Sequence, residues 1–372
     1  VSQGGVRRGA SAAYLPVDHG DFWQFIRMRR PEGDQNRQCL NTHHGICITD
    51  DFIARAKAGD KEAREKWGEI LKARMETGEP YLFFTDNVAR NRPDCYKERN
   101  LDVKGSNICT EIFLHTDDDH SFVCCLSSMN LARWDEWKDT DAVELATWFL
   151  DGILSEFIIK ASKISGFERA VRSAEKGRAI GLGAMGFHTY LQEHMVPVDS
   201  FEAFGLNAQM FSGMQRQAFK ASTELAKEYG EPEWCKGSGR RNTHLIALAP
   251  TVSNSLISGN VSPSIEPWAA NVFVQKSSKG TIIQKNRTLV ALLEKKDKNI
   301  DEVWKSIERE NGSVQHLDFL SAEEKEVFLT ARELNQFSLV KLAGQRQRWI
   351  DQGQSLNLFF PQNADPKYIH EV

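Results

Sequence analysis

The stretch Asn107-Ile108-Cys109-Thr110-Glu111 places an amide, a thiol and a carboxylate at every second position of the chain. In an extended segment alternate side chains point the same way, so the thiol would lie roughly 6–7 Å from each polar neighbour. That spacing would set a sulfur, a base and a hydrogen-bonding amide against one small polyhydroxylated ring. The alternative is a half-buried strand edge with one core cysteine, and the pentapeptide alone favours it because cysteine is among the most buried residues.

The composition is that of an ordinary globular protein, with 372 residues of which 41% are hydrophobic and 26% charged. The net charge of −4 does not indicate a basic surface for nucleic acid, so we expect no DNA partner. No apolar run approaches the roughly 20 residues of a membrane span, so we expect no membrane partner either.

Seven cysteines are scattered along the chain without zinc-binding spacing, so we expect no metal site. Their odd number fits a reducing, cytoplasmic compartment. They are Cys39, Cys47, Cys95, Cys109, Cys124, Cys125 and Cys235.

Short apolar runs alternate with longer helical patterns, which indicates an α/β fold. The expected strands are 10–16, 45–48, 81–84, 122–126, 245–249 and 271–274, and the expected helices are 21–26, 50–75, 142–164, 204–229 and 322–350. No linker divides the chain, so we expect one domain over residues 1–372.

Cys124 follows Cys109 by 15 residues, with the turn-rich acidic stretch 117–120 between them. Two extended segments joined by that loop would bring the sulfurs near each other, and a redox thiol needs a second thiol as electron source. The simpler reading of Cys124 alone is an inward-facing strand residue.

The segment 249–257 follows an expected strand and opens a helix with small hydroxyl and amide residues. Free N–H groups at such a helix start suit a phosphate. Ordinary N-capping by Ser253 or Thr251 explains the same residues equally well.

Gly181-Leu182-Gly183-Ala184-Met185-Gly186 matches the dinucleotide-binding fingerprint G-x-G-x-x-G. That fingerprint should follow a buried strand, but residues 168–176 are charged and helical in pattern. We therefore favour glycines that allow close packing at a helix start over an NAD(P)-dependent dehydrogenase.

Taken together, ordered blocks of this sequence resemble the catalytic large (alpha) subunit of class I ribonucleotide reductase over essentially the whole chain. The blocks are Ser2-Gln3-Gly4-Gly5-Val6-Arg7, Asn107–Glu111, Cys124 with Leu126–Leu131, Arg178–Gly183, Arg241-Asn242 with Pro250–Ser255, and Asp351-Gln352 with Gln354–Phe359. The resemblance implies a partial ten-stranded α/β barrel with a finger loop that carries the radical cysteine.

The resemblance also implies the roles of individual residues in reducing a ribonucleoside diphosphate to its 2′-deoxy form. Cys109 would become a thiyl radical and abstract the ribose 3′-hydrogen, and Glu111 would be the general base for the 3′-hydroxyl. Asn107 would bind substrate hydroxyls, and Cys124 would be half of the reducing dithiol. The substrate diphosphate would be held by Pro250, Thr251, Val252, Ser253 and Asn254. Gln3 and Arg7 would recognise the substrate base in response to a bound effector.

Two positions depart from the family pattern: Cys125 stands where the family usually has Asn, and Arg8 where it usually has Gly. Cys125 would compete in disulfide exchange, and Arg8 would add charge to a loop that flexes beside the base. Compared with the family it resembles, the chain corresponds to an incomplete barrel. It would lack the family's N-terminal ATP-binding region, first barrel strands and C-terminal tyrosine pair. We therefore expect a split-gene component that is inactive alone.

The resemblance further implies the partners of the reaction. These are complementing fragments of the catalytic subunit, the ribonucleotide substrate, nucleoside triphosphate effectors, a small subunit that supplies the radical from di-iron or manganese, and thioredoxin or glutaredoxin as reductant. The assembled catalytic subunits would form a homodimer, and this chain itself would bind no cofactor. Two other hypotheses stay open: an adenosylcobalamin-dependent reductase, which shares the Asn-x-Cys-x-Glu pattern, and a non-catalytic scaffold.

Overall fold

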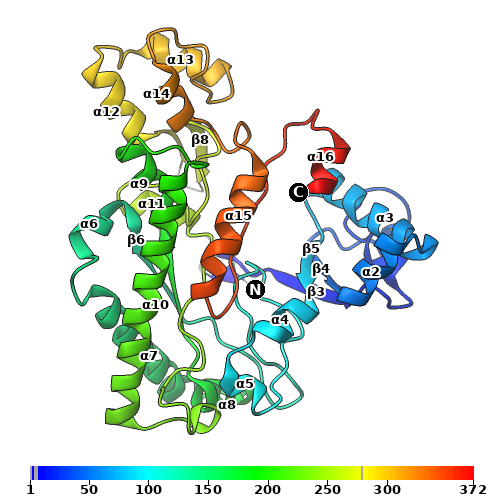
Figure 1. The fold of residues 1–372 in the computed structure, drawn as a ribbon. Coiled ribbons are helices and arrows are strands. Elements are labelled where there is room, and N and C mark those ends of the chain that lie inside the picture. The colour runs from blue at the N-terminus through cyan, green and yellow to red at the C-terminus, as the bar shows by residue number, and fades with distance from the viewer. Residues whose placement is uncertain (1, 4–6, 278–279) are drawn as a thin grey trace. The chain divides into compact units, whose positions relative to one another are not determined.

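The computed structural model describes residues 2–3, 7–277 and 280–372. The chain divides into two compact units, Val1–Phe122 and Val123–Val372, and each is described here by itself (Figure 1).

The first unit is built on a parallel three-stranded sheet in the order β3-β4-β5. Its strands are β1 (Ser2–Gln3), β2 (Arg7–Arg8), β3 (Ser11–Pro16), β4 (Thr42–Ile48) and β5 (Tyr81–Phe84), with β1 and β2 paired antiparallel. Its helices are α1 (Phe22–Phe25), η1 (Gln35–Arg37), α2 (Asp50–Ala58), α3 (Lys61–Thr77), α4 (Thr85–Asn91) and α5 (Asp94–Lys97). Helices between parallel strands bury one face of the sheet, and the resulting core is Val17, Phe22, Ile26, Ile46, Ile48, Phe52, Ala63, Ile70 and Ala73.

The single helix expected over 50–75 is wrong, because the chain breaks it into α2 and α3. Gly59 lies in the left-handed region with φ of 98° and ends α2. The Asp60 carboxylate then accepts the N–H of Ala63 at 2.8 Å and caps α3. Glycine at a helix end and aspartate at a helix start are the usual punctuation of two helices.

The second unit contains a parallel pair of strands, β6 (Leu126–Asn130) and β7 (Gly181–Met185). Isolated parallel bridges, Leu182 with Ile246 and Leu248 with Gln354, continue the sheet through two further segments. The strand expected at 245–249 is present only as isolated bridges at Ile246 and Leu248. The strand expected at 122–126 is wrong in its bounds, because β6 begins at Leu126 and leaves Cys124 and Cys125 before it.

Helices surround this sheet, and the longest, α10, packs against α7 and α15. The helices are η2 (Leu131–Arg133), α6 (Trp134–Trp137), α7 (Ala142–Ala161), α8 (Glu168–Gly177), α9 (Phe187–Glu193), α10 (Phe201–Tyr229), η3 (Glu233–Cys235), α11 (Val252–Ile257), α15 (Gln336–Arg346), η4 (Gln347–Trp349) and α16 (Pro366–Glu371). The helix expected over 322–350 is wrong, because α14 (Ala322–Val327) ends early and Asn335 caps α15 by accepting the N–H of Phe337 at 3.0 Å.

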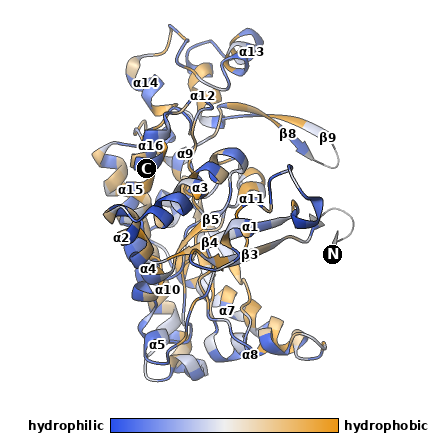
Figure 2. Ribbon diagram, turned by 90° about the vertical axis from the view of Figure 1, so that its right-hand side faces the viewer, coloured by the Kyte–Doolittle hydropathy of each residue, from blue (hydrophilic) through white to orange (hydrophobic). Residues whose placement is uncertain are grey.

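A smaller hydrophobic core joins β8 (Val272–Ser277) to α12 (Arg287–Lys295), α13 (Asp301–Arg309) and α14. Strand β8 pairs antiparallel with β9 (Gly280–Lys285), and the two strands extend away from these helices (Figure 2). They expose Val274, Ile282 and Ile283. Throughout the described part of the chain, no helix combines the length and apolar character needed to cross a membrane.

Candidate active site

The Asn107–Glu111 segment forms a turn instead of an extended strand. The Thr110 N–H donates to the Asn107 carbonyl at 3.1 Å, and Thr110 has a left-handed φ of 68°. The expected side-chain alternation is therefore wrong. A turn brings its flanking residues together, so Asn107 and Glu111 meet directly while Cys109 lies at the bend between them.

The Asn107 side chain connects both ends of this turn. Its Oδ1 accepts the N–H of Glu111 at 3.0 Å and that of Ile112 at 3.1 Å, and its Nδ2 donates to Glu111 Oε2 at 2.9 Å. An amide is needed for this pattern, because it must both accept from the backbone and donate to a carboxylate.

Glu111 is almost fully buried, at 1% exposure. Burial raises the pKa of its carboxyl above the ordinary value, and the hydrogen bond from Asn107 only partly offsets the increase. A carboxylate in such a setting is a stronger base once it is ionised, which suits a group that must accept a proton.

Cys109 is half-buried on the turn. Burial raises the pKa of Tyr81 to about 12, and the charges of Glu79, Tyr14 and Cys109 contribute to the increase. The thiol is thus close enough to Tyr81 for the two groups to interact electrostatically.

Tyr14 on β3 supports the segment just before the turn, a role that no sequence motif predicted. Its hydroxyl hydrogen-bonds Ser106 Oγ at 2.5 Å. A Cβ added at Gly105 would lie 3.1 Å from the Tyr14 ring, and one added at Gly45 on β4 would overlap it. The two glycines therefore make room for the ring, and they were the only available sequence signal for this support.

Cys124 and Cys125 lie side by side in sequence but differ in environment. Cys124 is exposed. Cys125 is buried, its Sγ donates to the Leu150 carbonyl at 3.4 Å, and burial raises its pKa to about 11. Because the thiolate is the reactive form, Cys125 is poorly suited to compete in disulfide exchange. Cys124 belongs to the second unit, so its approach to Cys109 stays a prediction.

The segment 250–254 forms a tight turn into α11. Thr251 has a left-handed φ of 49°, and its Oγ1 accepts the N–H of Ser264 at 2.8 Å. The side chain of Thr251 therefore does not cap α11, which removes one of the two capping explanations. The first backbone hydrogen bond of the helix runs from the Ser255 N–H to the Thr251 carbonyl at 2.8 Å. The N–H groups of Val252, Ser253 and Asn254 come before it in the chain.

The expected specificity loop is described only in part. The backbones of Gln3 and Arg7 pair across β1 and β2. The side chains of these two residues, and all of Gly4, Gly5 and Val6, lie outside the described residues, so the effector-reading role of Gln3 and Arg7 stays a prediction.

A buried ion-pair network anchors the segments that lead into the second unit's sheet. Arg178 donates from Nε and Nη2 to the two carboxylate oxygens of Asp151 at 2.8 and 2.9 Å. Arg241 and Asn242 donate to the same carboxylate at 3.0 and 2.9 Å. Burial raises the pKa of Asp151, but the two arginines outweigh it and hold that pKa below the ordinary value.

The glycine fingerprint at 181–186 is part of a buried strand and not a phosphate loop. Gly181 and Gly183 lie within β7, and a Cβ at Gly183 would come 2.6 Å from the Ala247 carbonyl oxygen. A dinucleotide fingerprint needs these glycines after the strand, so the structure does not support the dehydrogenase hypothesis. The expected close packing is correct, but it occurs in a strand because the neighbouring segment 245–248 approaches so closely.

Comparison with known proteins covers the whole chain. The family model described as "Ribonucleotide reductase, barrel domain" matches residues 1–63, 59–238 and 232–372. The putative ribonucleoside-diphosphate reductase large subunit of Frog virus 3 (isolate Goorha) is 44% identical over 386 residues, which include all of this chain and 68% of the viral protein. The ribonucleoside-diphosphate reductase large subunit of Invertebrate iridescent virus 3 is 35% identical over 444 residues, covering all of this chain and 70% of that protein.

A solved structure is also similar. The class Id ribonucleotide reductase alpha subunit of Actinobacillus ureae matches with a TM-score of 0.91 and 45% identity. The match covers 97% of this chain and 66% of that alpha subunit. The chain thus spans close to two thirds of the length of these relatives.

Proposed function

Because this chain belongs to the family of ribonucleotide reductase large subunits, we propose that it carries the radical site that reduces ribonucleoside diphosphates to 2′-deoxyribonucleoside diphosphates. The contact between Asn107 and Glu111 across the turn that holds Cys109 is the observation that supports this site most strongly. It puts a thiol, a buried carboxylate and an amide within one short loop.

The first chemical steps use these three groups. The sulfur radical of Cys109 takes the 3′-hydrogen atom of the ribose and becomes a thiol, which leaves the radical on the sugar. The Glu111 carboxylate accepts the proton of the 3′-hydroxyl, and its raised pKa makes it a suitable base. Asn107 hydrogen-bonds the substrate hydroxyls and keeps the carboxylate in one orientation.

The later steps need two electrons from outside this loop. The 2′-hydroxyl leaves as water, and a dithiol that becomes a disulfide supplies the electrons. Cys124 is one half of that dithiol, and its exposure suits a thiol that thioredoxin or glutaredoxin must later reduce.

The start of α11 is proposed to hold the substrate diphosphate through residues Pro250 to Asn254. Three N–H groups precede the first helical hydrogen bond, and such groups bind anions. The Thr251 hydroxyl already accepts from Ser264 N–H, which favours phosphate binding over side-chain capping by Thr251 at this turn.

The partners follow from the same family. The likeness to a class I alpha subunit supports a small subunit that supplies the radical, and a dimer of catalytic subunits. Gln3 and Arg7 would read a nucleoside triphosphate effector. Assays of the assembled complex with a di-iron or manganese small subunit, and separately with adenosylcobalamin, distinguish the two radical sources.

The substitution Glu111→Gln tests the proposed base in the assembled reductase. We expect deoxyribonucleotide formation to fall by about 100-fold or more, because a neutral amide cannot accept the proton. Glu266→Gln is a matched control. Glu266 is also buried and bonded to an asparagine, because its Oε1 accepts the N–H and Nδ2–H of Asn357 at 3.0 and 2.8 Å.

Glu266→Gln retains both of these acceptor contacts, so its activity should stay near wild type. An assembled complex in which Glu111→Gln is as active as Glu266→Gln would contradict the proposed mechanism and would support the non-catalytic scaffold.

A further inference from the structure

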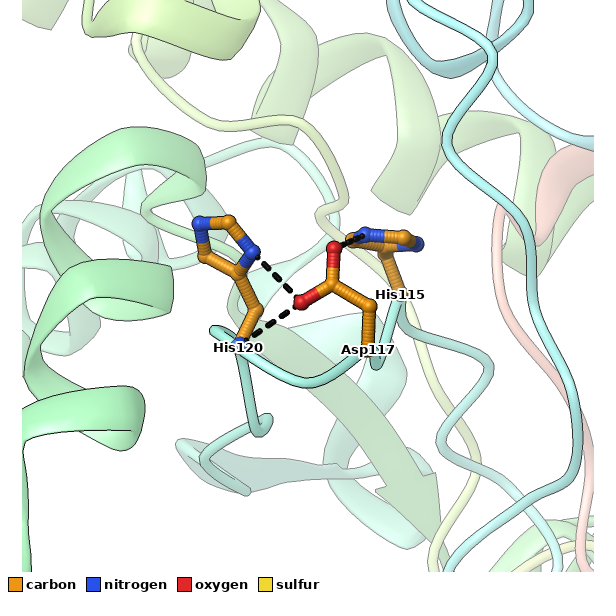
Figure 3. Close-up of side chains that lie close together, drawn as sticks. All are labelled: His115, Asp117 and His120. Atoms are coloured by element: carbon orange, nitrogen blue, oxygen red, sulfur yellow. Dashed lines mark hydrogen bonds and ion pairs between the residues drawn. The ribbon is translucent and has the colours of Figure 1, made fainter.

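Three side chains with metal-binding atoms meet in the loop that follows the Cys109 turn (Figure 3). They are His115, Asp117 and His120, and one ligand atom from each lies within 4.8 Å of the others. His115 Nε2 is 2.9 Å from Asp117 Oδ2, and His120 Nδ1 is 2.9 Å from Asp117 Oδ1. Figure 3 shows the two imidazoles on opposite sides of the carboxylate.

In its neutral form, His115 would turn the lone pair of Nε2 toward this carboxylate. His115 is buried, and its Nδ1 lies 2.8 Å from the Asp102 carbonyl oxygen. A carbonyl only accepts hydrogen bonds, so Nδ1 carries the proton and Nε2 of the neutral ring is an acceptor. Two acceptors 2.9 Å apart repel each other unless a proton or a cation lies between them. A backbone carbonyl that fixes the ring in this way is the usual outer contact of a metal-binding histidine.

Backbone hydrogen bonds hold the Asp117 carboxylate in place. Its Oδ1 accepts the N–H groups of Asp119 and His120, both at 2.8 Å. The site thus offers a carboxylate oxygen beside two imidazole nitrogens.

A second histidine–carboxylate cluster in the same unit shows the contrasting arrangement. Glu79 contacts His43 and lies 3.1 Å from His44 Nδ1, but Arg29 Nε is also 3.3 Å from its Oε2. That guanidinium supplies a permanent positive charge. Among the described residues, Asp117 forms its ion pairs with His115 and His120.

We propose that His115, Asp117 and His120 bind one divalent transition-metal ion of the Zn²⁺ type. Two imidazoles and a carboxylate are ligands that Zn²⁺ accepts, and three protein ligands leave a coordination position for water. The lack of zinc-like cysteine spacing predicted no metal site, whereas this set has the form His-x-Asp-x-x-His. A bound ion would hold residues 115–120, which follow Cys109 in the chain, in one conformation.

Titration calorimetry of the full chain with Zn²⁺ under reducing conditions tests the proposal, with Co²⁺ as a spectroscopic probe. We expect one site, which His120→Ala and Asp117→Asn each weaken by about tenfold or more. Both residues lie in the loop away from the buried core, so the variants should fold. His43→Ala is the matched control, because it removes a histidine–carboxylate contact from the cluster that already holds an arginine, and it should leave the affinity unchanged.

The spectrum separates this site from the cysteines. Co²⁺ bound by nitrogen and oxygen shows visible d–d bands without a thiolate charge-transfer band. Hydrogen exchange should slow in residues 113–121 when Zn²⁺ is added to the wild-type chain and should not slow in His120→Ala. Equal affinity in His120→Ala, Asp117→Asn and wild type, a thiolate band in the wild-type complex, or no binding would each overturn the proposal.

Discussion

The substitution Asn107→Asp changes one group in the contact that organises the candidate active site. Asn107 Oδ1 accepts two backbone N–H groups, and an aspartate oxygen would still accept them. Asn107 Nδ2, however, donates to Glu111 Oε2 at 2.9 Å. In Asn107→Asp an oxygen replaces that nitrogen, so two carboxyl groups face each other in a buried place.

The magnitude follows from the distance between the charges. Two unit charges with centres about 4 Å apart repel by about 4 kcal/mol at an effective dielectric constant of 20. That exceeds the roughly 0.5–1.5 kcal/mol of the single hydrogen bond that is lost. If one carboxyl keeps its proton, it becomes a donor again and the contact is restored.

The pH dependence has a definite sign. Burial raises the pKa of Glu111 in the folded chain, so the folded state binds more protons than the unfolded state between the two pKa values. Stability contributed by such a group is present below the unfolded pKa and is lost as the pH rises through the folded pKa. Asn107→Asp raises the folded pKa further, so its destabilisation should be large at pH 7.5 and small at pH 5.

Unfolding by heat or urea at pH 5 and pH 7.5 measures this difference. Asn299→Asp is the matched control, because Asn299 Nδ2 donates to Glu294 Oε1 at 3.1 Å on the exposed surface. There water and salt screen the repulsion, so little stability should be lost at either pH. Equal destabilisation of Asn107→Asp at both pH values, or none at pH 7.5, would refute the reasoning.

Two further substitutions test the second unit by thermal unfolding. Asp151→Asn leaves the buried guanidinium of Arg178 and the partly buried guanidinium of Arg241 without their shared counter-charge and should cost about 3–5 kcal/mol at neutral pH. Because the pKa of Asp151 is lowered, its stabilisation is present above the unfolded pKa and lost as the pH falls through the folded pKa, so the difference from wild type should shrink in acid. Gly183→Ala sets a Cβ 2.6 Å from the Ala247 carbonyl oxygen and should cost about 1–3 kcal/mol. Gly213→Ala, in α10 with nothing within 4 Å, should instead gain about 0.5–1 kcal/mol.

The sequence identified the α/β fold and the residues of the turn, but not the geometry of the turn. The positions of β3, β5, α7 and α10 follow from local patterns of apolar residues, which is why they were predictable. Thr110 adopts a left-handed conformation that its β-branched side chain does not favour. The contacts of Asn107 with the backbone on the far side of the turn stabilise that conformation, and no local pattern reports them.

Other errors arose from contacts between residues far apart in sequence. Tyr14 supports the loop at Ser106 only because Gly45 on the adjacent strand lacks a side chain. Strand β7 resembled a phosphate loop because its glycines accommodate the neighbouring segment at Ala247. The break at Gly59 and Asp60, in contrast, was readable from their capping preferences.

The most direct test of the central claim is deoxyribonucleotide formation by the assembled reductase with Cys109→Ser. A serine hydroxyl does not form the radical that a thiol forms, so we expect complete loss of product. Cys39→Ser is the control, because the Cys39 thiol is exposed and donates to Thr42 Oγ1 at 3.2 Å, a contact that serine can keep. It should retain full activity. Turnover by Cys109→Ser equal to that of Cys39→Ser would contradict the assignment of Cys109 as the radical site.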